Sequence, residues 1–223
     1  MPGGDLATQF PARMVAGMLW RALEPIEVER TLNEFCAGGF RHGGHELGVI
    51  LRQLERNLNV FWTSSCGRVL DAVACLIGAC GERTYEGEPA IKLEAWANGG
   101  DPDRLELEPI LEDKDGMTVM DTSQLLISII DALRNGVPRR HIAASAQRAV
   151  ARGLAEIAVE AASSRGVRAV GGSGGVFCNR TITATVRALV EGSGLKFFIH
   201  ELLPPGDGGV SVGQAVMAAR STF

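Results

Sequence analysis

A glycine-rich run in the last quarter of the chain has the composition of a phosphate-binding turn. It reads Gly171-Gly172-Ser173-Gly174-Gly175-Val176-Phe177-Cys178-Asn179-Arg180, between a short apolar stretch at 166–170 and an amphipathic stretch beginning near Asn179. Glycines allow close backbone approach to a ligand. The amides and dipole of a helix start favour an anion. The run is neither a Walker loop nor a complete Gly-x-Gly-x-x-Gly. We expect a nucleotide-binding turn, although a tight strand-to-helix connection would use the same residues.

A second turn of this kind follows about thirty residues later. The segment Pro204-Pro205-Gly206-Asp207-Gly208-Gly209 holds one carboxylate at the start of another expected helix. Two glycine-flanked turns so close in sequence suggest one site.

The bulk composition fits a cytoplasmic globular protein. The 223 residues are 46% hydrophobic and 22% charged, enough for one sizeable core or two small lobes. The net charge of −4 argues against a broad nucleic-acid-binding face. No apolar run approaches the roughly 18 residues of a membrane span, and we expect no membrane association. Five cysteines without a Cys-x-x-Cys pair favour reduced thiols.

Hydrophobic periodicity predicts a helix-rich α/β chain that positions these turns. The expected strands are 105–111, 117–120, 167–170 and 195–200, with a turn at 113–116 between the first two. The expected helices are 10–21, 25–36, 46–58, 67–77, 89–96, 123–133, 139–164, 179–191 and 209–220. We expect residues 1–62 to form a helical side lobe or insertion and residues 63–223 to form a nucleotide-binding α/β lobe, packed as one unit.

Several blocks resemble a known family. They are Pro2-Gly3-Gly4-Asp5, the segments 63–74 and 85–90, Gly174 to Arg180, and 203–214. In this order they are similar to the carboxy-terminal part of the HypF family, the carbamoyltransferases that mature nickel-iron hydrogenases. The resemblance covers essentially the whole chain. It implies the second lobe of an actin-like, ribonuclease H-like ATPase fold with a helical insertion.

The resemblance also implies roles for individual residues in ATP binding. Asp71 would face the ribose, with Gly87 and Glu88 at the neighbouring turn. Asn179 would lie beside the phosphates or ribose, and Gly174 and Gly175 would give close backbone approach. Asp207 would act in catalysis as a ligand of a divalent metal, either Mg, Fe or Zn, because a carboxylate suits a cation that bridges phosphates.

Each of these polar residues also has a structural interpretation. Asp71 could cap or solvate its own helix. Glu88 could be a carboxylate in the first turn of its helix, where the helix dipole favours a negative charge. Asn179 could be a helix cap. Asp207 could be an ordinary turn residue.

The implied reaction converts carbamoyl phosphate and ATP to a carbamoyl-adenylate and transfers the carbamoyl group to a cysteine thiol of a hydrogenase-maturation partner. In the family, histidine metal ligands precede the block at Pro2 to Asp5. A first lobe carrying them would therefore be a separate chain or a removed part, and this chain alone would be incomplete. Two alternatives stay open: a threonylcarbamoyl-transferase subunit for tRNA modification, and an inactive nucleotide-binding or interaction module.

Overall fold

A computed structural model describes residues 1–220, which divide into two compact units. The first comprises Met1–Val150 and the second begins at Ala151, so the division falls within helix α8 (Arg139–Ser164). The expected division between residues 62 and 63 lies inside the first unit. The reason is packing: α2 (Ala12–Leu19), from the expected side lobe, lies against α5 (Cys66–Leu76).

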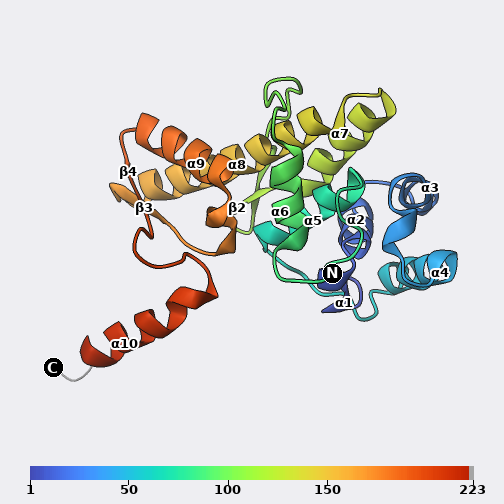
Figure 1. Ribbon diagram of the computed structural model, residues 1–223, viewed down its shortest axis with the longest axis horizontal. Helices are drawn as coiled ribbons and strands as arrows, with labels where there is room; N and C mark the ends of the chain where they lie inside the picture. Colours follow the sequence, from blue (N-terminus) through green and yellow to red (C-terminus); the bar gives the residue numbers. More distant parts are fainter. Residues whose placement is uncertain (221–223) are drawn as a thin grey trace. The chain divides into compact units, whose positions relative to one another are not determined.

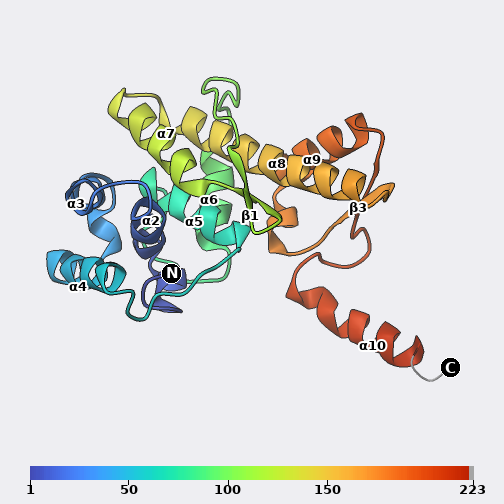
Figure 2. The same ribbon diagram turned by 180° about the vertical axis from the view of Figure 1, so that it is seen from behind.

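The first unit is a bundle of helices around α2 and α5, seen from two sides in Figures 1 and 2. Helix α5 also packs on α6 (Glu88–Trp96), and α2 packs on α7 (Thr122–Arg134). The remaining elements are α1 (Leu6–Gln9), α3 (Pro25–Phe35), the 3-10 turn η1 (Ala37–Gly39), α4 (Gly43–Glu55) and the first part of α8.

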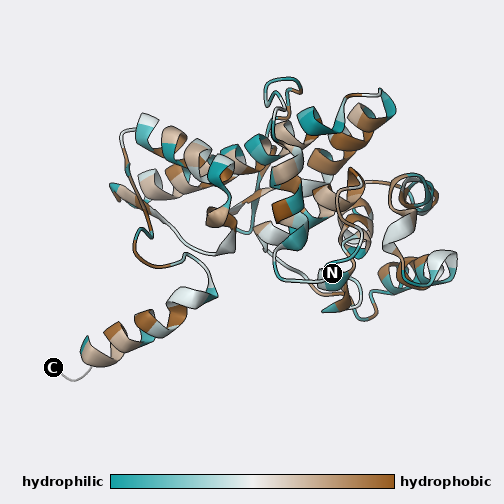
Figure 3. Cartoon of the chain, in the orientation of Figure 1, coloured by the Kyte–Doolittle hydropathy of each residue, from teal (hydrophilic) through white to brown (hydrophobic). Residues whose placement is uncertain are grey.

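Small and branched side chains let α2 and α5 approach closely. In α5 every residue from Leu70 to Leu76 is buried, and in α2 Val15, Ala16 and Leu19 are fully buried. Figure 3 shows the apolar colouring of these helices. Burial of this kind stabilises by about 25 cal/mol per Å² of apolar surface. The packing leaves Asp71 as the one charged residue within the buried stretch of α5.

The hairpin between α6 and α7 corrects one strand prediction. Strand β1 is Leu111–Lys114, not 105–111, and pairs antiparallel with β2 (Met117–Met120). The turn has only two residues, Asp115 and Gly116, both with positive φ. Such a two-residue turn matches the twist of a hairpin and sets the register Lys114 to Met117. Pro109, which lacks a backbone N–H, precedes the strand.

The second unit contains a βαβ arrangement that carries both glycine turns. Strand β3 (Ala169–Gly172) pairs in parallel with β4 (Lys196–Ile199), and α9 (Arg180–Gly192) connects them after the 3-10 turn η2 (Gly175–Cys178). Helix α9 buries Ile182, Val186 and Val190 and packs on β4. The unit ends with η3 (Asp207–Gly209) and α10 (Val210–Arg220).

The described elements are mostly helices with two two-stranded sheets. This is the helix-rich α/β composition that the sequence predicts. Among the helices of residues 1–220, none is both long and apolar enough to cross a bilayer.

Candidate functional site

The two glycine turns meet at one edge of the second unit. The backbone N–H of Gly174 donates a hydrogen bond of 2.6 Å to the carbonyl oxygen of Pro205. A Cβ placed on Gly206 would lie 3.9 Å from both the Cα and the N of Gly175. The turns follow β3 and β4, and ligands of parallel sheets bind beyond the carboxyl ends of the strands. The structure therefore brings Gly174, Gly175 and the turn of Asp207 together, as the sequence suggests.

Two positions in the first turn require glycine. Gly174 has φ of +101° and ψ of 161°, a conformation essentially restricted to glycine. At Gly172, a Cβ would lie 2.9 Å from the ring of Phe177 and 3.0 Å from that of Phe197. The turn is thus shaped by steric constraints before any ligand is considered.

Asn179 occupies the N-cap position of α9. Its side-chain oxygen accepts a hydrogen bond of 2.9 Å from the backbone N–H of Ile182, and the residue is buried. The capping interpretation is therefore realised. A contact of its amide group with a nucleotide stays a prediction.

Asp207 lies at the start of η3 and is exposed. Within residues 1–220 no group of three or more His, Cys, Asp or Glu side chains could enclose a metal ion. A single carboxylate nevertheless fits a cation whose other ligands are phosphate oxygens and water, which is how Mg²⁺ usually binds beside a nucleotide. Asp207 can therefore contribute one ligand.

Asp71 lies in the first unit and is buried inside α5. Its side chain is 1% exposed, and its Oδ2 lies 2.8 Å from a guanidinium nitrogen of Arg68 in an ion pair without hydrogen-bond geometry. Burial raises the pKa of Asp71 to about 6, against the opposing charges of Arg68 and Arg83. The carboxylate faces an arginine here, and its contact with a ribose stays a prediction.

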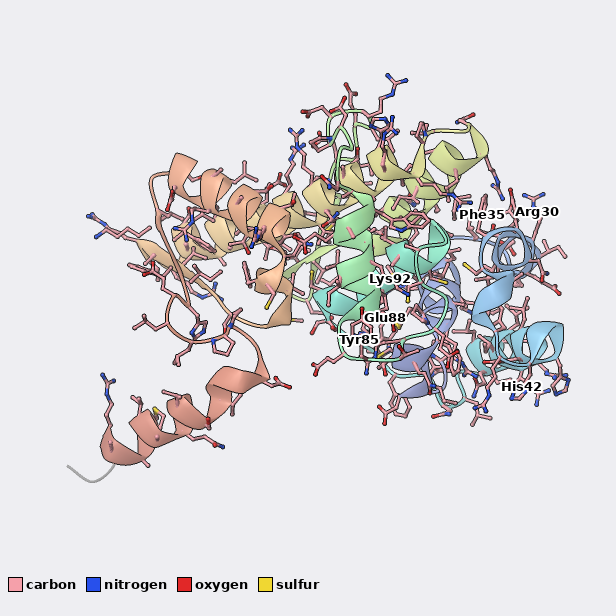
Figure 4. All side chains as sticks on the ribbon, viewed as in Figure 1. Arg30, Phe35, His42, Tyr85, Glu88 and Lys92 are labelled. Atoms are coloured by element: carbon pink, nitrogen blue, oxygen red, sulfur yellow. The ribbon has the colours of Figure 1, made fainter. Side chains whose placement is uncertain are left out.

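Glu88 begins α6, directly after Gly87, whose φ is +76°. One carboxylate oxygen accepts hydrogen bonds from the backbone N–H and the hydroxyl of Thr84, at 2.6 and 2.8 Å. The other oxygen pairs with Lys92 at 2.7 Å. Figure 4 labels Glu88 and Lys92 on α6 and Tyr85 in the turn before it. Lys92 and then Thr84 lower the pKa of Glu88 to about 2. These contacts close the turn before α6.

An open pocket of about 720 Å³ lies beside this turn. Its lining includes Gly3, Gly4, Asp5, Arg83, Tyr85 and Glu86. The pocket joins the Pro2–Asp5 block to the segment before α6, which are far apart in sequence. Asp5, Arg83 and Tyr85 of this lining are not among the residues predicted for the site. The signal available for Asp5 was its place directly after a glycine, since Asp5 follows Gly3-Gly4 and Asp207 follows Gly206.

The cysteines are free thiols, and only Cys178 is exposed. Burial raises the pKa of Cys66, at the start of α5, to about 11. A thiol with so high a pKa is protonated and weakly nucleophilic.

The seven predicted site residues thus form two groups. Asp71, Gly87 and Glu88 belong to the first unit, and Gly174, Gly175, Asn179 and Asp207 belong to the second. Within the second group the two turns are in contact. Within the first, Asp71 and Glu88 are both buried, and the pocket is lined by the turn that precedes Glu88.

The fold and the site together define a class of protein, a helix-rich α/β lobe with two glycine turns in contact. The chain belongs to the family described as carbamoyltransferase, Kae1-like domain, second subdomain, whose model matches residues 1–214. It is 37% identical over 216 residues to the probable carbamoyltransferase HypF of Methanocaldococcus jannaschii, which covers 96% of this chain and 27% of that protein. A HypF homologue of Cupriavidus necator is 33% identical over 99% of this chain and 55% of its own length.

Solved structures confirm the fold. The crystal structure of T. kodakarensis HypF matches with a TM-score of 0.86 and 39% identity, over 98% of this chain and 28% of that one. Full-length HypF in its phosphate- and nucleotide-bound form matches with a TM-score of 0.83 and 29% identity, over 99% and 28%. The chain therefore spans between about a quarter and just over half of the length of these proteins.

Proposed function

We propose that this chain is the ATP-binding lobe of a HypF-type carbamoyltransferase. The observation that carries the proposal is the contact between the two glycine turns at Gly174 and Pro205. It brings the turn that carries Asp207 against the first glycine turn, which supports a site for a metal-bound triphosphate because such a ligand needs both a carboxylate and close backbone approach. The family membership and the nucleotide-bound HypF relative support it.

The proposed reaction has three steps. Carbamoyl phosphate is hydrolysed to carbamate and phosphate, carbamate attacks the α-phosphorus of ATP and releases pyrophosphate, and a thiolate attacks the carbamoyl carbon and releases AMP. Asp207 would hold a divalent cation, Mg, Fe or Zn, which neutralises phosphate charge. The glycine turn would hold the phosphates by backbone approach, so this chain supplies electrostatic rather than covalent catalysis.

The proposed partners follow from the same assignment. The acceptor would be a cysteine of a hydrogenase-maturation protein, and a first lobe with histidine ligands would complete the metal site. We also propose a cytoplasmic location, because free thiols persist in a reducing compartment.

A tRNA-modifying function is the second candidate. The chain is 29% identical over 170 residues to the tRNA N6-adenosine threonylcarbamoyltransferase of Synechococcus, covering 74% of this chain and 45% of that protein. The net charge of −4 favours a protein acceptor over tRNA.

Pyrophosphate release tests the proposal. The 223-residue chain would be incubated with ATP, magnesium and carbamoyl phosphate, with and without a first lobe taken from a HypF relative. We expect release that needs carbamoyl phosphate and rises with the added lobe. Release that depends on threonine and tRNA would select the second candidate. If calorimetry shows no ATP binding, the result would favour a catalytically inactive interaction module.

A further inference from the structure

Ser173 and His200 form a polar contact beside the two glycine turns that the proposed function does not yet use. Strands β3 and β4 pair in parallel with Gly172 opposite Ile199. Ser173 directly follows β3, and His200 directly follows β4. Because paired parallel strands end at the same edge, the two side chains lie together, with Ser173 Oγ 3.1 Å from His200 Nε2.

The single hydroxyl proton of Ser173 has two acceptors within reach, the Pro205 carbonyl oxygen and His200 Nε2, and the His200 tautomer decides between them. Ser173 donates to the carbonyl oxygen of Pro205 at 3.3 Å. We assign the imidazole proton to Nε2, because His200 then donates to the Ser173 oxygen and both contacts of the hydroxyl are satisfied. The Pro205 carbonyl also accepts from the Gly174 N–H at 2.6 Å. Both lone pairs of that carbonyl are therefore used by residues of the first turn.

This arrangement differs from a serine nucleophile with a histidine base. A base that activates serine must receive the hydroxyl proton. In the assigned tautomer the serine proton is donated to Pro205, and among residues 1–220 no carboxylate is hydrogen-bonded to His200 to orient its ring, as a catalytic triad requires. The contact is suited to holding one turn against the other.

We propose that Ser173 and His200 are positioning residues that fasten the Asp207 turn to the first glycine turn. Pro205 is two residues from Asp207. Holding the Pro205 carbonyl in place therefore restricts the position of the backbone at Asp207. The role in nucleotide binding rests on the proposed function, whereas the fastening itself can be measured without a nucleotide.

Amide hydrogen exchange of the ligand-free 223-residue chain tests the fastening directly. The Gly174 amide, which is bonded to Pro205, is the reporter. One lost hydrogen bond corresponds to about a three- to tenfold effect, so Ser173→Ala should speed exchange there by about that factor. Ser173→Thr keeps the hydroxyl and His200→Gln keeps an N–H donor, so both should exchange nearly as the wild type does. Ser193→Ala, which removes an exposed hydroxyl bonded to Leu189 at the end of α9, is the matched control and should leave Gly174 unchanged.

The same variants separate this proposal from the proposed function. If the wild type binds ATP with magnesium, Ser173→Ala should weaken binding about three- to tenfold and Ser173→Thr should restore it. If the wild type binds no ATP, the proposed function is wrong. The hydrogen-exchange measurement still tests the fastening role, because it uses the ligand-free chain. Unchanged exchange at Gly174 in Ser173→Ala, or equal acceleration in Ser173→Ala and Ser173→Thr, would overturn the fastening role.

Discussion

Asp71 and Glu88 belong to the same unit, yet their pKa values are shifted in opposite directions. Burial inside α5 raises the pKa of Asp71 from 3.8 to about 6, whereas Lys92 and Thr84 lower that of Glu88 from 4.5 to about 2. The charged form of Asp71 therefore destabilises the folded state. The charged form of Glu88 stabilises it through its contacts with Lys92 and Thr84.

The substitution Asp71→Asn should change how stability depends on pH. The folded state binds the Asp71 proton more tightly than the unfolded state, so the wild type loses stability as pH rises from about 4 to about 6. Asp71→Asn removes that loss and should gain at most about 3 kcal/mol relative to the wild type by pH 7, a figure that already includes the opposing attraction of Arg68. Urea unfolding followed by tryptophan fluorescence measures it, because Trp20, Trp62 and Trp96 all lie in the first unit. A pH-independent difference between the two proteins would contradict the burial argument.

The substitution Glu88→Gln should show the opposite pH dependence. The contribution of Glu88 is present above pH 4.5 and is lost as pH falls towards 2. Glu88→Gln should therefore lower the thermal midpoint at pH 7 and converge on the wild type at pH 2 to 3. The exposed neighbour Glu86 is the matched control, and Glu86→Gln should have little effect at either pH. A Glu88→Gln deficit that persists at low pH would show that the carboxylate's charge is irrelevant.

The substitution Gly174→Ala tests the shape of the first glycine turn. A Cβ at φ of +101° costs about 1–3 kcal/mol. We expect faster hydrogen exchange across residues 169–179 and weaker nucleotide binding. Gly171→Ala is the matched control, because Gly171 lies in β3 with open space around its Cα and without a positive φ. Equal effects at both positions would exclude a special requirement at Gly174.

Two substitutions at Asn179 separate its capping role from a ligand role. Asn179→Ala removes the acceptor for the Ile182 N–H and should cost about 1 kcal/mol of stability. Asn179→Asp keeps the cap but adds a negative charge, so it should preserve stability and weaken ATP binding. Circular dichroism melts and calorimetric titration would measure the two effects. Full ATP affinity in Asn179→Asp would exclude a position beside the phosphates.

Helix positions were well predicted from sequence because hydrophobic periodicity determines them. The prediction of 139–164 matches α8 at both ends, and 67–77 differs from α5 by one residue at each end. The strand at 105–111 was wrong because its apolar residues alternate with glutamates as in a strand, whereas the true strand, Leu111–Lys114, has only one apolar residue. Only the Asp115–Gly116 turn conformation sets the register.

The second half of the candidate site was predictable for a topological reason. Both glycine turns follow strands that pair in parallel, so they end at one edge. The pocket at Asp5 and Tyr85 could not be predicted in this way. It depends on the tertiary fold of a helical unit, where residues 80 positions apart meet without a sheet to align them.

Calorimetric titration of ATP, with and without magnesium, tests the central assignment of Asp207 most directly. The chain would be compared with Asp207→Ala and with Glu201→Ala, which removes an exposed carboxylate six residues earlier. We predict that magnesium strengthens ATP binding to the wild type and to Glu201→Ala, and that Asp207→Ala loses most of this gain while keeping its metal-free affinity. Equal losses for Asp207→Ala with and without magnesium would contradict its role as a metal ligand.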